Sequence, residues 1–196
     1  MASLSGKTVL VVGGSSGIGY GVAKASLLSR AAKVTIGSSS QAKIESARAI
    51  CSADKGGEGG PRTVVGRLGF PNIDLDANKD FFDVRFWGAF TAAQVAKIRP
   101  GGSITLTVGS VVVKPRKGWS LAAGLMGAVD SLTRGLAVDL APIRVNVISP
   151  GAVKTELWDP NASRKPDEIA EAYLFCMKCQ YITGQRIEVD GGAKYV

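Results

Sequence analysis

The amino-acid sequence predicts an α/β fold in which a doubly wound parallel sheet is flanked by helices. Two observations support this class: short β-branched apolar runs alternate with longer stretches of helical spacing, and the first run leads directly into a glycine-rich turn. With 45% hydrophobic and 20% charged residues, the 196-residue chain can bury one full core, and it shows no internal repeat. We therefore expect a single domain over residues 1–196.

Six strands are expected where short apolar, β-branched runs stand between loop signals. They are Lys7–Val12, Lys33–Gly37, Thr63–Val65, Ser103–Val108, Arg144–Ser149 and Gln185–Val189. Helices are expected where apolar residues recur with helical spacing between those runs. They are Gly17–Ser29, Gln41–Cys51, Asp76–Ile98, Trp119–Leu140 and Asp167–Lys178. Glycine and proline mark the loops at residues 56–61, 100–102 and 160–166.

Composition excludes several classes of site. Histidine is absent, which excludes Ser-His-Asp and Cys-His nucleophile systems and His-ligated metal centres. The three cysteines are an odd number and follow no export signal, so we expect a reducing, cytoplasmic setting without disulfides. Cys176 and Cys179 form a C-x-x-C in a stretch that reads as helix, which favours two buried or half-buried thiols over a redox or metal site. No metal site is expected.

Charge and hydropathy patterns argue against nucleic acid and membrane as partners. The formal charge is +8, but the basic residues are scattered. The tightest basic group, Lys114, Arg116 and Lys117, has no interleaved aromatic residues. No apolar stretch reaches the roughly 18 residues of a membrane span, and the start of the chain lacks the basic region of a secretory signal. We expect neither nucleic-acid nor membrane binding.

The strongest chemical signal is the turn Gly13-Gly14-Ser15-Ser16-Gly17-Ile18-Gly19, which follows the first strand and opens the first helix. Gly13 allows a tight turn, Gly17 lets the backbone approach a pyrophosphate, and Gly19 lets the helix pack closely on the strand. Free N–H groups at the helix N-terminus then meet the phosphates. This context favours a Rossmann-type dinucleotide site over a purely structural turn. The expected contacts are Gly13, Ser15, Ser16, Gly17, Ile18 and Gly19.

The end of the second strand indicates the cofactor. NAD-binding Rossmann proteins carry a carboxylate here for the ribose 2′-hydroxyl, whereas this chain has Ser38, Ser39 and Ser40. Their hydroxyls, the N–H groups of the next helix and Lys43 can bind a 2′-phosphate, so NADP is favoured over NAD. In the alternative interpretation the serines cap the helix, with Ser40 as the N-cap, and both roles are compatible.

Several motifs in order make the chain resemble the short-chain dehydrogenase/reductase family over nearly its whole length. They are GGSSGIG at Gly13–Gly19, FDVRFWGAF at Phe82–Phe90, GGSITLT at Gly101–Thr107, LTRGLAVDLAPIRVNVISPGAVKTEL at Leu132–Leu157 and YITGQRIEVDGG at Tyr181–Gly192. The resemblance implies an oxidoreductase with NAD(P)-dependent hydride transfer on a small-molecule substrate. It also implies a homodimer or homotetramer built from the two long helices.

The same resemblance assigns cofactor contacts after the fifth strand. Pro150 and Gly151 form the Pro-Gly segment of the family. The backbone of Val153 then meets the nicotinamide carboxamide, and Thr155 reaches the phosphates. The alternative is a plain strand-to-helix turn.

The family's catalytic residues Asn, Ser, Tyr and Lys are all replaced. Counting back from Leu132-Thr133-Arg134 puts Ala122 and Met126 at the Tyr and Lys positions, and neither can move a proton. Arg85 stands at the Asn position, and Gly109, followed by Ser110, at the Ser position. The FDVRFWG and Gly118-Trp119 pieces resemble a divergent branch in bacteria and fungi that also lacks the Tyr and Lys.

Three explanations remain open for the altered site. In the first, hydride transfer persists on an acceptor that needs no proton, such as an iminium ion. Fungal alkaloid-pathway relatives of secondary metabolism work in this way, and some of them also guide a cyclisation. Alternatively, Ser110, Arg85, Arg116 or Lys117 polarises a carbonyl. Thirdly, the fold is a non-catalytic NADP-binding sensor or scaffold. Trp119 is a candidate substrate-stacking surface, with a core or interface role as the alternative.

One feature of the expected sheet is anomalous. A doubly wound sheet needs two strands between the second helix and Asp76, one of them central, and only Thr63–Val65 is a candidate. A missing central strand leaves the backbone groups of its neighbours without partners. We therefore expect an intact polypeptide longer than 196 residues, with extra length at residues 51–76 and 155–167. A genuine deletion is the alternative.

Overall fold

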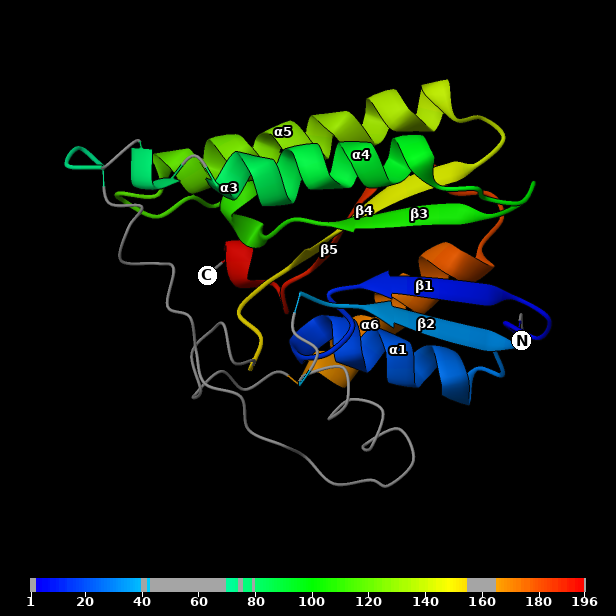
Figure 1. Ribbon diagram of the computed structural model, residues 1–196. Coiled ribbons are helices and arrows are strands. Elements are labelled where there is room, and N and C mark those ends of the chain that lie inside the picture. The colour runs from blue at the N-terminus through cyan, green and yellow to red at the C-terminus, as the bar shows by residue number, and fades with distance from the viewer. Residues whose placement is uncertain are drawn as a thin grey trace. The chain divides into compact units, whose positions relative to one another are not determined.

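The computed structural model of the chain (Figure 1) describes residues 3–39, 42, 70–73, 76–78, 80–154 and 165–195. The chain divides into two compact units. One consists of Met1–Thr63 with Ala152–Lys178, and the other of Val64–Gly151 with Cys179–Val196. Each unit contains a parallel sheet and helices, as the α/β prediction requires.

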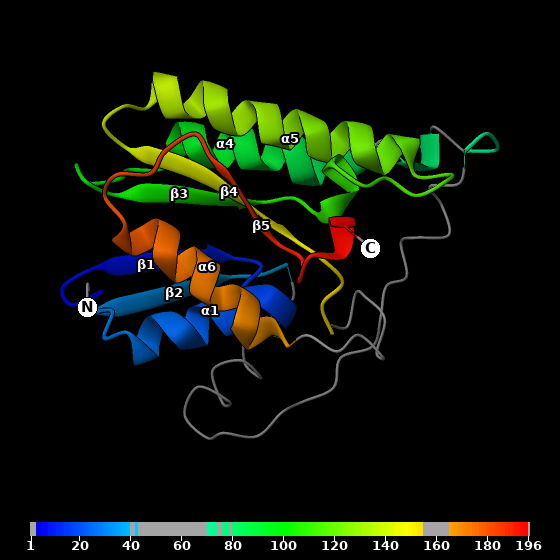
Figure 2. The same cartoon turned by 180° about the vertical axis from the view of Figure 1, so that it is seen from behind.

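The first unit is built on two parallel strands. β1 (Thr8–Val12) pairs with β2 (Lys33–Gly37) in a register that runs from Thr8↔Lys33 to Val12↔Gly37. Alternate β1 residues, Val9 and Val11, are buried. Figures 1 and 2 show α1 (Gly17–Leu28) and α6 (Pro166–Lys178) side by side in this unit. They approach so closely at Gly21 that an added Cβ would lie 3.1 Å from the Pro166 carbonyl oxygen.

The second unit is built on three parallel strands in the order β3-β4-β5. These are β3 (Ser103–Thr107), β4 (Arg144–Pro150) and β5 (Arg186–Val189). Every residue of the central strand β4 is buried, as expected for a strand covered on both faces. Both views show α4 (Gly88–Val95) and α5 (Ser120–Asp139) packed together on one side of this sheet.

The helix expected over Asp76–Ile98 is a composite segment. It consists of the 3₁₀ turn η2 (Asp76–Asn78), α3 (Asp80–Phe82), the π-helical turn η3 (Asp83–Trp87) and α4. The segment ends at Val95 because Ala96 adopts an extended backbone. π-Helical turns occur frequently at functional sites, and this one contains Arg85. We call the run from Asp80 to Val95 the helical arm.

The remaining expected elements agree closely with the structure. Each described strand lies within one residue of its predicted bounds, and α1, α5 and α6 begin and end within one residue of theirs. The strand Thr63–Val65 and the helix Gln41–Cys51, apart from helical Ala42, lie outside the described residues. The short turns η4 (Ser110–Val112) and η5 (Ala193–Tyr195) have no counterpart in the prediction.

The described strands form two separate sheets rather than one continuous sheet. Within the described residues, β1 is paired along its length with β2 alone. The exposed fractions of Leu10 and Val12 are 64% and 76%, so one face of β1 is open in the described part of the chain. The expected extra length at residues 51–76 and 155–167 stays a prediction, because most of these residues lie outside the described part of the chain.

Two further expectations concern thiols and hydropathy. Cys176 is buried, Cys179 is half-buried and both are free thiols, while Cys51 lies outside the described residues. α5 is the one described helix whose length and composition would allow it to cross a membrane. Its Val129 and Leu136 pack in the core of the second unit, and a core helix of a globular domain meets the same criterion.

Candidate functional site

The glycine-rich turn of the first unit has backbone angles and close contacts that leave no room for side chains. Gly13 and Gly17 adopt positive φ angles of 77° and 52°. A Cβ at Gly19 would lie 2.3 Å from the Gly13 carbonyl oxygen, and one at Gly14 would lie 2.6 Å from Ile36 Cγ2. The glycines are therefore required by close packing between the turn, α1 and β2.

The N-terminus of α1 is open to an anion. α1 begins at Gly17, and the side chain of its N-cap residue, Ser16, makes no capping hydrogen bond. The first turn of α1 contains no acidic residue that would compete with a phosphate. The first backbone N–H groups of a helix have no partner within it, and together with the positive end of the helix dipole they suit a pyrophosphate, so these residues fit a dinucleotide.

Ser15 and Ser38 are brought together from the turn and from the end of β2. The Ser15 hydroxyl donates to Ser38 Oγ over 2.8 Å. Both side chains are half-buried, whereas Ser39 is exposed and Ser40 lies outside the described residues. Two adjacent hydroxyls without a carboxylate are suited to a 2′-phosphate.

The segment after β4 is described up to Lys154. β4 ends at Pro150, and Gly151 donates its N–H to the Val189 carbonyl over 3.1 Å. A Cβ at Gly151 would lie 2.9 Å from the Asp190 Cα, so this position also requires glycine. Val153 is buried, and Thr155 lies outside the described residues.

In the second unit, the positions assigned to the family's Tyr and Lys both carry apolar side chains. Ala122 is buried on α5, and Met126 lies one turn further on. Met126 packs against the buried cluster of Val108, Val129 and Val147. Phe86 of η3 and Val112 of η4 pack against the same cluster, which we call the apolar cluster.

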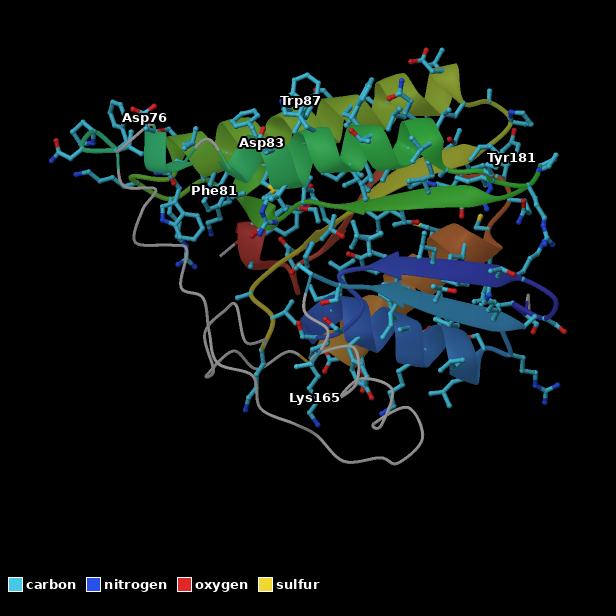
Figure 3. All side chains as sticks on the ribbon, viewed as in Figure 1. Asp76, Phe81, Asp83, Trp87, Lys165 and Tyr181 are labelled. Carbon is cyan, nitrogen blue, oxygen red and sulfur yellow. The ribbon has the colours of Figure 1, made fainter. Side chains whose placement is uncertain are left out.

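Arg85 lies on the π-helical turn next to Phe86. The residue is exposed, yet desolvation lowers the pKa of its guanidinium from the ordinary value. Because an arginine with a third or more of its surface in solvent keeps its proton, Arg85 remains a cation at neutral pH. Figure 3 shows Asp83 and Trp87, the two ends of the turn, on the side of the helical arm away from β3.

Ser110 and Trp119 are both placed by the loop that joins β3 to α5. Ser110 begins η4, and its carbonyl oxygen accepts the Lys114 N–H over 2.8 Å. Trp119 is the residue before α5 and is half-buried. The Arg116 guanidinium lies 5.6 Å from the centroid of the Trp119 ring. Arg116 therefore occupies one face of the ring that we expected to stack against a substrate.

The second unit also contains a charged network that the sequence alone did not predict. Buried Asp130 accepts from Arg134 and Arg186, at 3.0 and 3.2 Å, and Arg186 also bonds Glu188. Glu188 pairs with Lys194, and hydrogen bonds to Glu188 and Tyr195 raise the pKa of Lys194. Arg186 and Glu188 are two apart on β5 and so share a face, a signal present in the sequence.

The same network brings the C-terminal segment to the loop after β3. Lys114 Nζ donates to the Ala193 carbonyl oxygen over 2.8 Å. Figures 1 and 2 both show η5 beside η4 in the second unit. The expected candidates Arg85 and Ser110 thus lie on segments that meet at the apolar cluster, while Trp119 carries its own cation. No group of three or more Cys, Asp or Glu side chains suited to a metal occurs among the residues that the structure describes.

Comparison with curated proteins finds relatives along the whole chain. It is 30% identical to "Short-chain dehydrogenase/reductase fsr5" of Gibberella fujikuroi, covering 98% of this chain and 96% of that protein. It is 33% identical to "Short-chain dehydrogenase/reductase malC" of Malbranchea aurantiaca, covering 96% and 95%. These alignments run over 256 and 253 residues, whereas this chain has 196, so both relatives contain internal residues without a counterpart here.

Solved structures agree with this result. The structure of MalC Reductase/Diels-Alderase from Malbranchea aurantiaca matches with a TM-score of 0.85 and 29% identity, covering 98% of this chain and 96% of that one. A small-chain dehydrogenase in complex with NADPH matches with a TM-score of 0.75 and 30% identity, covering 98% and 100%. The family model for an SDR-like Rossmann domain matches residues 64–167. The chain therefore belongs to the short-chain dehydrogenase/reductase family of oxidoreductases.

Proposed function

We propose that this protein is an NADP(H)-dependent oxidoreductase that transfers hydride to an activated small molecule, such as an iminium ion. The observation that carries the proposal is the contrast between a glycine-rich turn fitted to a dinucleotide and an α5 with Ala122 and Met126 at the family's Tyr and Lys positions. The NADPH complex of a relative with 30% identity supports the choice of cofactor. The Ser15–Ser38 pair supports a 2′-phosphate.

Different residues of the chain bind different parts of the cofactor. The N–H groups of Ser16, Gly17, Ile18 and Gly19 bind the pyrophosphate, and Ser15, Ser38, Ser39 and Ser40 bind the 2′-phosphate. Pro150, Gly151, Val153 and Thr155 line the nicotinamide end. Bound NADPH supplies the hydride, and the protein orients the acceptor beside it and excludes water.

The kind of acceptor explains why the reaction proceeds without the family's Tyr and Lys. A carbonyl that receives hydride becomes an alkoxide and needs a proton, whereas an iminium cation becomes a neutral amine and needs none. Alternatively, Arg85, Ser110, Arg116 or Lys117 stabilises a developing alkoxide by hydrogen bonding, because an arginine is a poor proton donor at neutral pH. The match to a reductase that is also a Diels-Alderase supports a site that guides a cyclisation in secondary metabolism.

A non-catalytic NADP-binding sensor or scaffold is the second candidate. The apolar surroundings of Ala122 and Met126 favour it, because no described group on α5 there can transfer a proton. This candidate predicts cofactor binding without consumption of NADPH by any acceptor.

The proposal extends to assembly and location. We propose a homodimer or homotetramer formed through the helical arm and α5, where Trp87, Val95 and Val138 are 54%, 68% and 76% exposed. We also propose that the protein is cytoplasmic and consists of a single domain. We further propose that the intact polypeptide has extra length at residues 51–76 and 155–167, and an intact mass of 20.3 kDa would contradict this.

The experiment is a comparison of matched acceptors. NADPH and NADH consumption is measured with an N-methyl cyclic iminium salt and with the ketone of the same ring skeleton. The proposal predicts that the iminium is reduced at least about 100-fold faster than the ketone, from the lower end of what general acid catalysis contributes, and with NADPH rather than NADH. Equal rates for the two acceptors would contradict it, and NADPH binding without turnover of either would establish the second candidate.

A further inference from the structure

Two of the three segments that meet at the apolar cluster carry positive charge. Phe86 of η3, Val112 of η4 and Met126 of α5 pack against the cluster, which places their segments around one centre. Arg85 immediately precedes Phe86, and three further cations follow Val112 within five residues. These three are Lys114, Arg116 and Lys117, and the loop from Gly109 to Ser120 contains no acidic residue.

Contacts with uncharged groups hold part of this cationic set in place. Lys114 donates to the Ala193 carbonyl oxygen, and Arg116 lies over the Trp119 ring. Neither of these contacts involves a carboxylate. They fix the course of the loop and position Arg116 without neutralising the guanidinium.

The nearby acids already have partners. Glu188 pairs with Arg186 and Lys194. Asp190 accepts the N–H groups of Gly192 and Lys194. Within the part of the chain that the structure describes, no acidic side chain contacts Arg85, Arg116 or Lys117.

The acid nearest to Arg85 in the sequence does not face it. Asp83 is two residues away on the same helical turn, and residues at that spacing lie on different faces of a helix. Asp83 is also exposed to solvent, where screening weakens its effect on a neighbouring charge. Among the described residues, Arg85, Arg116 and Lys117 therefore form a set of cations that no carboxylate pairs with.

We propose that the substrate carries an acidic oxygen group, a carboxylate or phosphate, which Arg85 binds with support from Arg116 and Lys117. The inference rests on the proposed function and names the substrate class of that site. The planar guanidinium forms two parallel hydrogen bonds with a carboxylate or phosphate, which a lysine cannot reproduce. An iminium ion that also bears a carboxylate has no net charge, so these cations favour its binding over that of a simple iminium ion.

The test is calorimetric titration of the NADP⁺-loaded protein with a matched set of probes. The probes are an N-methyl dihydroisoquinolinium with a carboxylate, its methyl ester, the corresponding phosphate and inorganic phosphate alone. We expect the carboxylate or phosphate probe to bind at least about tenfold more tightly than the ester, as charge-assisted hydrogen bonds permit. The tighter of the two acidic probes identifies the group, and weak binding of inorganic phosphate shows that the ring is part of the recognised ligand.

Three variants assign the preference to Arg85. Arg85→Ala should reduce the acid-to-ester ratio to about one, and Arg85→Lys should restore only part of it because lysine loses the bidentate geometry. Lys97→Ala, which removes an exposed cation beyond the end of α4 in the same unit, should leave the ratio unchanged. The affinity for NADP⁺ should be the same in all variants, which shows that they are folded.

The outcomes separate the two proposals. Equal affinity for acid and ester in the unsubstituted protein, or an unchanged ratio in Arg85→Ala, overturns the anion site and leaves NADPH-dependent reduction standing. Failure of the unsubstituted protein to bind NADP⁺ contradicts the proposed function, and the comparison of acid with ester on the cofactor-free protein then decides the anion site by itself.

Discussion

The two compact units differ in which atoms carry their chemistry. In the first unit, backbone atoms form the expected dinucleotide site: a Cβ at Gly19 would overlap the Gly13 carbonyl, and the α1 N–H groups are open. In the second unit, we propose that side chains carry the reaction, with Ala122 and Met126 at the positions that we assign to the family's acid and its partner. A site made from backbone tolerates few substitutions, whereas a site made from side chains can change its chemistry while the helix that bears it is kept.

The largest expected effect comes from restoring the missing pair in the second unit. Ala122→Tyr combined with Met126→Lys should raise the rate of ketone reduction by about 10²–10⁴-fold, the usual contribution of general acid catalysis. NADPH consumption with a simple cyclic ketone measures it. The single variant Met126→Lys is the control and should give no gain, because lysine alone supplies no phenol. Rapid ketone reduction by the unsubstituted protein would contradict the account.

In the first unit, adding a single methyl group to the glycine-rich turn should weaken cofactor binding. Gly19→Ala places a methyl group 2.3 Å from the Gly13 oxygen, so the turn must shift. Overpacking costs roughly 1–3 kcal/mol, which corresponds to about a 5- to 150-fold loss of NADPH affinity. Gly127→Ala on α5, where an added Cβ meets nothing within 4 Å, is the matched control and should bind NADPH normally. Equal affinities in the two variants would show that the turn does not bind the cofactor.

Cofactor preference sharpens the comparison within the first unit. Ser38→Asp places a carboxylate beside Ser15, where the 2′-phosphate is expected. We expect NADP⁺ affinity to fall by about tenfold or more, from the loss of a hydrogen bond to a charged group, while NAD⁺ affinity is kept or improves. Ser39→Asp, at an exposed neighbouring position, tests whether the effect belongs to the Ser15–Ser38 pair. Titration with both cofactors decides between this site and helix capping alone.

The smallest effect concerns stability rather than binding. Arg30 follows the end of α1 and adopts a φ of 65°, a left-handed conformation that costs a residue with a side chain about 1–2 kcal/mol. Arg30→Gly removes this cost but adds roughly 0.5–1 kcal/mol of backbone entropy, so we expect a net stabilisation of about 0.5–1 kcal/mol. Urea unfolding measures it. Unchanged stability would show that the conformation of Arg30 is not strained.

The sequence predicted the elements of both units but not how the site residues are held. Strand and helix spacing placed every described strand, and the glycines placed the turn, because both signals are local. The π-helical turn around Arg85 was not predicted, since the spacing of apolar residues does not distinguish it from an α-helix. The cation over Trp119 and the pairing of Asp130 with Arg186 depend on contacts that local patterns do not encode.

The sheet, in contrast, depends on a signal from the whole chain rather than from a local pattern. The count of strands predicts that β1 lacks a central partner, and the described strands form two sheets. Relatives that align over more than 250 residues have internal segments without a counterpart in this 196-residue chain. The number of strands is a constraint on the whole sheet. It therefore predicts that a strand is lacking but does not identify the segment that would supply it.

The most direct test of the central claim is the pH dependence of hydride transfer in a single turnover. The protein is mixed with excess NADPH and an N-methyl iminium acceptor, which has no proton to lose, and nicotinamide absorbance is followed from pH 6 to 9. We expect a rate constant that does not change with pH, because no proton is transferred and Arg85 stays charged throughout this range. A rate constant that falls tenfold per pH unit above a single pKa would show that an acid of the protein donates a proton, and would contradict it.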